Sequence, residues 1–465
     1  MGKRLPAIVI LLVVGAASIA LGRFALDGLA VATGYAAKLT CSLSLTSGQP
    51  AEVVAAELLD HVLAPVSRRI AVTAADCCAS ARVFGLLHAR AIHRRGLGCT
   101  LLAGRDEKEM ASLGELPPRP SLDAGVPWPL GDAEPSTAEP AIAAAMDVAF
   151  RELDAPGSGR LRQTKAVVVA HRGRLVAERY AAGYSASTPM ISWSMAKSVT
   201  AALVGIAVSE GKLALAAPAP VREWAAAGDP RGAIVLDQLL RMSSGLAFDE
   251  TYGAVNDVSR MLFTEPDTAA YAARSPLAGE PDSLWSYSSG TSNIVARLLR
   301  EAIGGDVTDF VRYSRERLFD AAGMTSAFFE HDAAGTPVGS SFVFMTARDW
   351  ARFGELHRRD GLVDSRRVLP EGWVRYVTTP TPRAPEGSYG AHWWLNAGEP
   401  SDTSRRPWPA LPVDAYAARG YSGQWVLVVP SKELVIVRLG IAIPDDGDDG
   451  TEELAAAVIE ALARR

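Results

Sequence analysis

The sequence predicts a mixed α/β chain, in which an antiparallel sheet is flanked by helices and carries an inserted helical subdomain. Two observations lead to this fold class. Runs rich in β-forming residues occur at both ends of the main region, over Thr164–Tyr184 and Gly423–Ile443. The residues between the first run and about Arg300 show helical apolar spacing instead. We therefore expect one sheet assembled from both ends of the region, with the helices inserted between its strands.

The individual elements follow from local signals. Thr164–Tyr184 reads as two strands joined by the turn sequence HRGR, and Gly423–Ile443 as two β-branched runs on either side of a Pro-Ser-Lys turn. The closing segment TEELAAAVIEALARR is predicted to be a helix with Thr451 as its N-cap. Glu452 and Glu453 would then place negative charge in the first turn, where the helix dipole favours it.

Length and composition describe a folded globular protein of several parts. The chain has 465 residues, 48% hydrophobic and 21% charged, with a net charge of -5. No clustered basic face accompanies this mild charge, so nucleic-acid binding is not expected. We divide the chain into an N-terminal segment (1–23), a small cysteine-containing extension with helical stretches (24–115), a Pro- and Ser-rich extended linker (116–140) and the main domain (141–465).

The first residues resemble an export signal. Lys3 and Arg4 precede an apolar run over Ala7–Gly22, which ends at Arg23. This pattern is typical of a secretory signal peptide or of a short uncleaved membrane anchor. The run is slightly short for a membrane span, and AVA at Ala30–Ala32 is the best cleavage candidate. We expect export to the periplasm or another extracytoplasmic space, with tethering to the inner membrane slightly favoured over cleavage.

Four cysteines follow this segment, at positions 41, 77, 78 and 99. An exported chain meets an oxidising compartment, so disulfides are the natural interpretation. A bond between Cys41 and Cys99 would close the long loop, whereas Cys77 and Cys78 are adjacent in sequence; spacing alone does not fix the connectivity. No histidine stands at ligand spacing from any of them, so a metal site is not expected.

A possible nucleophile lies in the sequence ISWSMAKSVT, where Ser194 and Lys197 form an S-x-x-K pattern. The pattern recurs at Ser209 and Lys212, so the position in a helix must distinguish the two. Ser194 precedes a long helical run, where free N–H groups and the dipole favour a developing oxyanion. Ser209 lies at the far end of that run. Ser194 is therefore the better nucleophile, and Lys197 lies one turn further on the same face.

Lys197 acts as a base only if burial or a neighbouring cation lowers its pKa. The alternative to a catalytic pair is a structural one, in which Ser194 only begins the helix and the aliphatic part of Lys197 lies along apolar surface. Two other segments favour catalysis. WSYSSG places Tyr287 two residues before Ser289 and just before another helix. RGYSGQW places a turn before a strong strand, from which the N–H of Gln424 would supply a second oxyanion donor beside that of Ser194.

With these motifs the chain resembles the penicillin-binding-type serine hydrolases, which include class C β-lactamases, related esterases and nylon-oligomer hydrolases. The resemblance covers roughly residues 140–465, in the family's order of motifs. The three motifs are Ser194-Met195-Ala196-Lys197, Tyr287-Ser288-Ser289 and Tyr421-Ser422-Gly423. The resemblance implies a β-lactamase/transpeptidase-like fold and an acyl-enzyme on Ser194, with Lys197 and Tyr287 exchanging its proton. It implies no metal or organic cofactor, and a small ester, amide or peptide-like substrate.

Two departures from the family favour its esterase and nylon-oligomer hydrolase branch. Ser289 replaces the asparagine with which β-lactamases contact the substrate amide, and Tyr421 replaces the basic residue that attracts a carboxylate. Ser422 and Gly423 complete the predicted substrate-binding set on this motif. Tyr252 stands where that branch has a substrate-contacting tyrosine, although a buried structural tyrosine is an equal alternative.

The sequence is also compatible with other functions. A β-lactamase or D,D-peptidase acting on cell-wall-type substrates is the nearest alternative. A Ser-His-Asp hydrolase needs the sequence G-x-S-x-G, which GYSG at 420–423 lacks. His392 stands in an aromatic setting, YGAHWWLN, and is read as a wall residue of the substrate pocket rather than a general base. A binding or sensing module on the same fold would be free to lose Ser194, Lys197 or Tyr287, yet all three are present.

Overall fold

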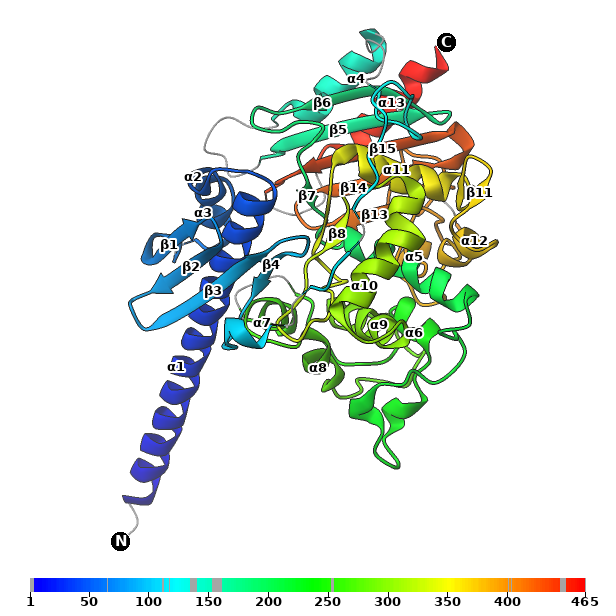
Figure 1. Ribbon diagram of the computed structural model, residues 1–465. Coiled ribbons are helices and arrows are strands. Elements are labelled where there is room, and N and C mark those ends of the chain that lie inside the picture. The colour runs from blue at the N-terminus through cyan, green and yellow to red at the C-terminus, as the bar shows by residue number, and fades with distance from the viewer. Residues whose placement is uncertain are drawn as a thin grey trace.

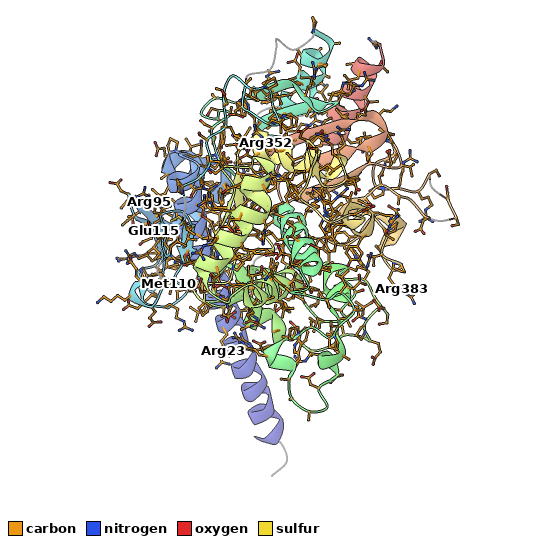
Figure 2. All side chains as sticks on the ribbon, turned by 45° about the vertical axis from the view of Figure 1, so that its right-hand side comes forward. Arg23, Arg95, Met110, Glu115, Arg352 and Arg383 are labelled. Carbon is orange, nitrogen blue, oxygen red and sulfur yellow. A yellow bond between two sulfur atoms is a disulfide. The ribbon has the colours of Figure 1, made fainter. Side chains whose placement is uncertain are left out.

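The computed structural model describes residues 4–64, 66–110, 113–116, 118–133, 140–152, 161–251, 255–399, 401–402, 404–443 and 449–464, with side chains from residue 21 onward. Figure 1 shows a long N-terminal helix whose first part projects from the body, a small sheet beside its second part, and a larger mixed domain. We call residues 4–110 the N-terminal unit and residues 140–464 the main domain. Arg23 lies where the helix leaves the body of the protein (Figure 2).

The main domain is built on a six-stranded antiparallel sheet of order β12-β13-β14-β15-β5-β6. Its strands are β5 (Thr164–His171), β6 (Arg174–Tyr180), β12 (Trp394–Leu395), β13 (Tyr416–Gly420), β14 (Gln424–Val429) and β15 (Leu434–Gly440). The late strand β15 pairs with the early strand β5, with Val437 opposite Val168. The predicted assembly of one sheet from both ends of the region is confirmed, and so are both predicted strand pairs.

Helices cover both faces of this sheet, which explains its unbroken apolar runs. Helices α4 (Pro140–Phe150) and α13 (Thr451–Ala463) pack together on one face, and α11 (Ala347–Arg358) lies on the other. Successive side chains of a strand point to opposite faces. Accordingly Val167 joins the core under α4 and α13, whereas Val168 joins the core on the opposite side.

A helical region lies between β6 and the late strands, as the apolar spacing predicts. Its helices are α5 (Met195–Ser209), α6 (Leu236–Leu240), α7 (Asp257–Phe263), α8 (Thr268–Ala273), α9 (Ser289–Ala302) and α10 (Val307–Ser314), followed after α11 by α12 (Trp373–Val377). A three-stranded sheet of order β7-β9-β8 joins it to the region before α5. Those strands are β7 (Met190–Ile191), β8 (Phe328–Phe329) and β9 (Val343–Met345).

The N-terminal unit combines α1 (Arg4–Cys41) and short helices over Ala51–Val62 with an antiparallel sheet. Its strands are β1 (Ile70–Ala75), β2 (Cys78–Val83), β3 (Leu87–Arg94) and β4 (Gly98–Leu101). Helical stretches in this part of the chain were predicted, and this sheet was not. Helix α1 packs closely on α7, where a Cβ at Gly34 would lie 1.9 Å from the carbonyl oxygen of Phe263.

The side chains of most of the predicted signal or anchor segment lie outside the described residues. Within the part of the chain that the structure describes, no helix combines the length and apolarity needed to cross a membrane.

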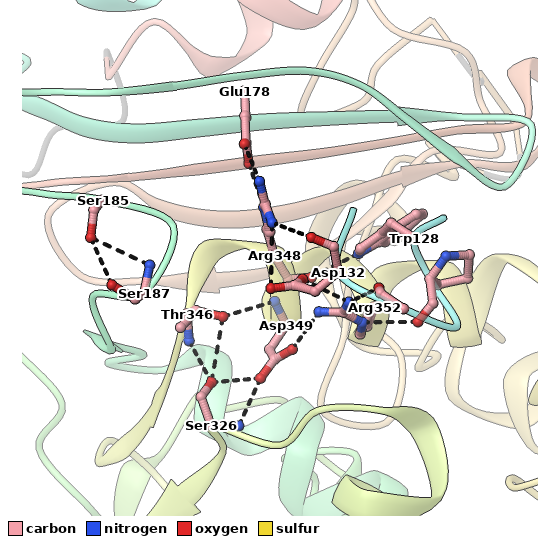
Figure 3. A network of polar contacts seen from close by, with 12 residues as sticks. Trp128, Asp132, Glu178, Ser185, Ser187, Ser326, Thr346, Arg348, Asp349 and Arg352 are labelled. Atoms are coloured by element: carbon pink, nitrogen blue, oxygen red, sulfur yellow. Dashed lines mark hydrogen bonds and ion pairs between the residues drawn. The ribbon is translucent and has the colours of Figure 1, made fainter. Parts of the chain in front are cut away.

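The Pro-rich segment between the two parts is irregular but firmly attached to α11. The Trp128 side chain is buried and its indole N–H donates to the carbonyl of Arg348 at 3.4 Å. The Arg352 guanidinium bonds the Gly131 carbonyl at 2.6 Å and the Asp132 carboxylate at 3.0 Å. Figure 3 shows these contacts continuing to Glu178 on β6 through Arg348. Residues 128–132 of this segment therefore belong to the packed structure.

One predicted helix cap is wrong. Thr451 is the first helical residue of α13, and the N-cap is Gly450, whose φ of 81° is readily adopted by glycine. The Thr451 N–H is satisfied instead by the Asp449 carboxylate at 2.9 Å. Asp449 lies just before the N-cap, so its carboxylate stands outside the helix. From there it accepts a hydrogen bond from one of the free N–H groups of the first turn.

Candidate active site

The first site residue, Ser194, lies at the N-terminus of the buried helix α5. Trp193 before it has a φ of 43°, an uncommon conformation for a bulky residue and one often found at functional sites. Ser194 is the N-cap of α5, yet within the described structure its hydroxyl makes no capping hydrogen bond. The hydroxyl therefore stays available at the positive end of the helix, as the sequence predicts.

Lys197 reaches this hydroxyl from the next turn of α5. Its Nζ lies 3.0 Å from Ser194 Oγ, 2.9 Å from Ser289 Oγ and 3.2 Å from the carbonyl oxygen of Ser340. The lysine is only 1% exposed, and this burial lowers its pKa to about 8. An amine of this kind is neutral often enough near neutral pH to accept a proton from a hydroxyl.

Tyr287 contributes an aromatic ring beside the same amine. Lys197 Nζ lies 4.7 Å from the centre of the Tyr287 ring, which is half-buried. The ring packs against Trp394 and Tyr389, with centroids 5.3 and 5.8 Å away. The first two sequence motifs therefore meet around Lys197, with aromatic surface on one side of the pair.

Sequence reasoning missed Glu250, which lies directly behind the second motif. Its carboxylate accepts hydrogen bonds from the backbone N–H of Ser289 at 2.7 Å and from the Ser289 hydroxyl at 2.5 Å. The Ser289 hydroxyl thus stands between the Lys197 amine and a carboxylate at the N-terminus of α9. The negative charge opposes the effect of burial and raises the pKa of Lys197. Glu250 precedes the predicted site residue Tyr252 by two positions, but nothing in the sequence indicates that its carboxylate contacts Ser289.

The third motif forms the turn between β13 and β14. Gly420 approaches the nucleophile most closely, because a Cβ there would lie 2.3 Å from the Ser192 oxygen and 3.1 Å from Ser194 N. Gln424 begins β14 opposite Gly420 and is buried. Its side-chain amide donates to the carbonyls of Tyr421, Ser422 and Gly440, at 3.1, 3.1 and 2.6 Å. Gln424 therefore fixes the shape of the turn whose backbone faces Ser194.

Some of the predicted substrate-binding residues are buried behind the site. His392 and Ser422 are each 2% exposed, and the predicted substrate-binding residue Ser289 is 1% exposed. His392 Nε2 lies 2.9 Å from the Ser292 hydroxyl, and burial lowers the pKa of His392 to about 3. The histidine is therefore neutral, and it joins α9 to the loop before β12. Tyr421 is half-buried, and Tyr252 lies outside the described residues.

The other candidates are also placed. Ser209 is the last residue of α5 and bonds the Ile206 carbonyl, while Lys212 is exposed, so the second S-x-x-K match forms no site. Cys41 and Cys99 form a disulfide; Cys77 and Cys78 are free thiols with sulfur atoms 3.2 Å apart. No group of three or more acidic, cysteine or histidine side chains suited to a metal ion occurs among the described residues.

Comparison with known proteins agrees with this geometry. The family described as Beta-lactamase matches residues 149–457. The 6-aminohexanoate-dimer hydrolase of Paenarthrobacter ureafaciens is 24% identical over 302 residues, which cover 59% of this chain and 72% of the relative. Protein Rv1367c of Mycobacterium tuberculosis is 28% identical over 326 residues, covering 56% and 79%.

Solved structures give the same fold. A Bacillus anthracis protein provisionally described as a 6-aminohexanoate-dimer hydrolase superposes with a TM-score of 0.55 at 23% identity, covering 65% of this chain and 80% of that one. A penicillin-binding protein homologue from Caulobacter crescentus gives 0.52 at 17% identity, covering 70% and 99%. The predicted fold class is confirmed. With the family match spanning all three motifs, the chain belongs to the Beta-lactamase family and is a serine hydrolase of the penicillin-binding type.

Proposed function

We propose that the protein hydrolyses a small ester or amide through an acyl-enzyme on Ser194. The observation that carries this proposal is the 3.0 Å contact between Lys197 Nζ and Ser194 Oγ, made by a buried amine with a lowered pKa. Lys197 is held by a hydroxyl and a carbonyl rather than by a direct carboxylate partner. Its lone pair is therefore available to Ser194 whenever the amine is neutral.

The reaction follows from these positions. Neutral Lys197 accepts the Ser194 proton while Oγ attacks the substrate carbonyl, which gives a tetrahedral oxyanion. The N–H of Ser194 and one N–H of the β13–β14 turn stabilise this oxyanion; Gln424 is the donor expected from sequence, and the position of Gly420 adds Tyr421 as a candidate. Lys197 and Tyr287 return the proton to the leaving group. Water then attacks the carbonyl of the acyl-enzyme and gives its proton to Lys197 and Tyr287. These groups return the proton to Ser194 Oγ as the acid leaves.

Residues that differ from the family motifs support the proposed substrate class. Tyr421 provides no positive charge at the third motif, so a substrate carboxylate gains no ion pair there. The ring of Tyr287 stands with Trp285, Tyr389 and Trp394, which gives one side of the site an aromatic character. A relative named for hydrolysis of the 6-aminohexanoate dimer supports linear amides and simple esters as the first compounds to test.

A fluorophosphonate probe tests the proposal. We expect the wild-type protein to gain one adduct, mapped to the peptide with Ser194, and the Ser194→Ala variant to gain none. Lys212→Ala is the matched control for Lys197→Ala, because of these two lysines only Lys197 contacts Ser194. Hydrolysis of p-nitrophenyl esters or amide oligomers would support the proposed substrate class, and turnover of nitrocefin alone would favour a β-lactamase. A folded protein that neither labels nor hydrolyses would support the non-catalytic binding module.

We also propose that the protein is exported and tethered by its N-terminal segment. The Cys41–Cys99 disulfide supports this, because such bonds persist in oxidising compartments. An alkaline phosphatase fused after the main domain should be active in cells, and carbonate washing should leave the protein with the membrane. An inactive fusion would contradict export, and release by the wash would contradict tethering.

A further inference from the structure

An aromatic cluster connects the N-terminal unit to the residue before the nucleophile. Tyr35 of α1 stacks on Trp193, with ring centroids 6.5 Å apart and planes inclined by 16°. Trp193 also contacts Phe342 at 6.0 Å and the Tyr421 ring at 5.5 Å. Phe263 of α7 contacts both Tyr35 and Phe342. We call these five residues the aromatic cluster; it reaches from α1 to the turn before Ser194 and the turn after β13.

Tyr35 contributes its ring to this cluster, and its hydroxyl contributes no stabilising hydrogen bond among the described residues. The residue is 5% exposed, and its hydroxyl finds no hydrogen-bond partner among the described residues. A buried hydroxyl without a partner is unfavourable. Packing of the ring against Trp193 and Phe263 is therefore the favourable contribution of this residue.

A buried ion pair fixes α1 to the same part of the main domain. Lys38 Nζ is paired with the Glu330 carboxylate and lies 4.1 Å from the centre of the Phe342 ring. Glu330 is fully buried and also accepts from the Ser42 hydroxyl at 2.9 Å and the Cys99 N–H at 2.6 Å. The Cys41–Cys99 disulfide joins the two segments of the N-terminal unit that supply these donors.

The segment after Glu330 leads directly to the active site. It includes Ser340, whose carbonyl accepts from Lys197, and continues into β9. Strand β9 pairs with β7, and the Ser192 N–H donates to the Val343 carbonyl at 2.8 Å. Contacts from α1 thus reach the nucleophile turn by two paths, through the ring of Trp193 and through β9.

We infer that the N-terminal unit positions the nucleophile, with Tyr35 as a positioning residue for Ser194. This unit lies outside residues 149–457 that match the family, so the chain carries a support for its nucleophile that the family match does not include. The uncommon backbone of Trp193 needs surrounding contacts to hold it. Tyr35 supplies one face of those contacts. The expected effect on the reaction rate of Ser194 rests on the proposed function. The expected effect on the backbone before Ser194 rests on the structure alone.

Two measurements on the full chain test this inference. Tyr35→Leu keeps an apolar side chain and removes the ring, and Tyr35→Phe removes only the unpartnered hydroxyl. Val83→Ala, in β2 of the same unit and 1% exposed, is the control for general loosening. Amide hydrogen exchange over residues 190–200 should accelerate at least tenfold in Tyr35→Leu and stay within twofold of wild type in the other two variants.

Fluorophosphonate labelling of Ser194 gives the second readout. We expect Tyr35→Leu to lower the maximal labelling rate at least tenfold, with less than a twofold change in the probe concentration at half-saturation. Tyr35→Phe should label within twofold of wild type. The inference is overturned if Tyr35→Leu matches Val83→Ala in exchange over residues 190–200, whatever the labelling shows. A wild-type protein that does not label contradicts the proposed function instead, and the exchange result still decides the inference.

Discussion

Two lysines of this chain are buried to a similar degree but belong to different environments. Lys38 of the N-terminal unit is 2% exposed and Lys197 of the main domain is 1% exposed. Burial lowers the pKa of both. Lys38 meets the carboxylate of Glu330 directly, whereas Lys197 meets two hydroxyls and a carbonyl. Its carboxylate, Glu250, stands one hydroxyl further away.

The difference shows how the immediate partner determines the role of a buried amine. A direct carboxylate favours the charged form, and the pair then holds two parts of the chain together. Hydroxyl and carbonyl partners satisfy the amine without holding its proton so firmly, and the amine can exchange that proton with Ser194. The separated carboxylate of Glu250 keeps the pKa of Lys197 from falling further. Changes at Lys197, Lys38 and Glu250, and a change of pH, test this contrast.

The largest effect is expected when Lys197 is replaced by methionine. This change removes the base and keeps an apolar side chain of similar length. Labelling of Ser194 by the fluorophosphonate should fall by roughly 10³-fold or more, in the range of a lost general base. The unfolding free energy at pH 7 should stay equal or rise, because the folded protein no longer buries an amine with a lowered pKa. A large loss of stability would show that Lys197 is a structural lysine.

Lys38→Met should have the opposite signature. It leaves the Glu330 carboxylate buried without its cation, and breaking such a pair costs about 3–5 kcal/mol. Urea unfolding should report this loss. The double variant Lys38→Met/Glu330→Gln should recover part of it, because the remaining group is uncharged. If Lys38→Met unfolds at the wild-type urea concentration, the ion pair does not hold the N-terminal unit.

The pH dependence of labelling gives the third effect. At pH values below its pKa of about 8, the Lys197 amine is mostly protonated and cannot accept the Ser194 proton, so activity falls as pH falls. Between pH 6 and pH 9 the rate should rise roughly 100-fold, with its midpoint near the lysine pKa. Rates are corrected with Ser194→Ala at each pH. A profile that is flat over this range would mean that another group accepts the proton.

Glu250→Gln should produce the smallest effect. Removing the negative charge removes the contribution that raises the pKa of Lys197, so the midpoint of the pH profile should move to lower pH. Glu280→Gln, an exposed carboxylate in the same helical region, is the control and should leave the midpoint in place. A midpoint that moves upward in Glu250→Gln would contradict the proposed arrangement around Ser289.

The sequence predicts the main domain well because its signals are local. Runs rich in β-forming residues, bounded by turn residues, locate β5, β6, β14 and β15, and position in a helix distinguishes Ser194 from Ser209. The strands of the N-terminal unit escaped prediction although CASARV alternates, because the inward face of this run is marked mainly by alanines, which have low β-propensity. Such strands gain their order from pairing and from packing on α1.

The contacts around the site depend on the tertiary fold, and these the sequence could not show. Glu250 is 39 residues from Ser289, and Lys38 is 292 residues from Glu330. No spacing rule connects such pairs. The burial of His392 was likewise hidden, because an aromatic neighbourhood in sequence fits both a pocket wall and a core. The motifs therefore indicate the chemistry, and the fold determines which residues support it.

The most direct measurement of the central claim is the mass of the enzyme quenched with acid during hydrolysis of a p-nitrophenyl ester. We predict a wild-type population heavier by one acyl group, located on the peptide that contains Ser194, and no such population for Lys197→Met. Ester hydrolysis that continues in wild type with the acyl group on another residue, or in Ser194→Ala at the wild-type rate, would contradict the account.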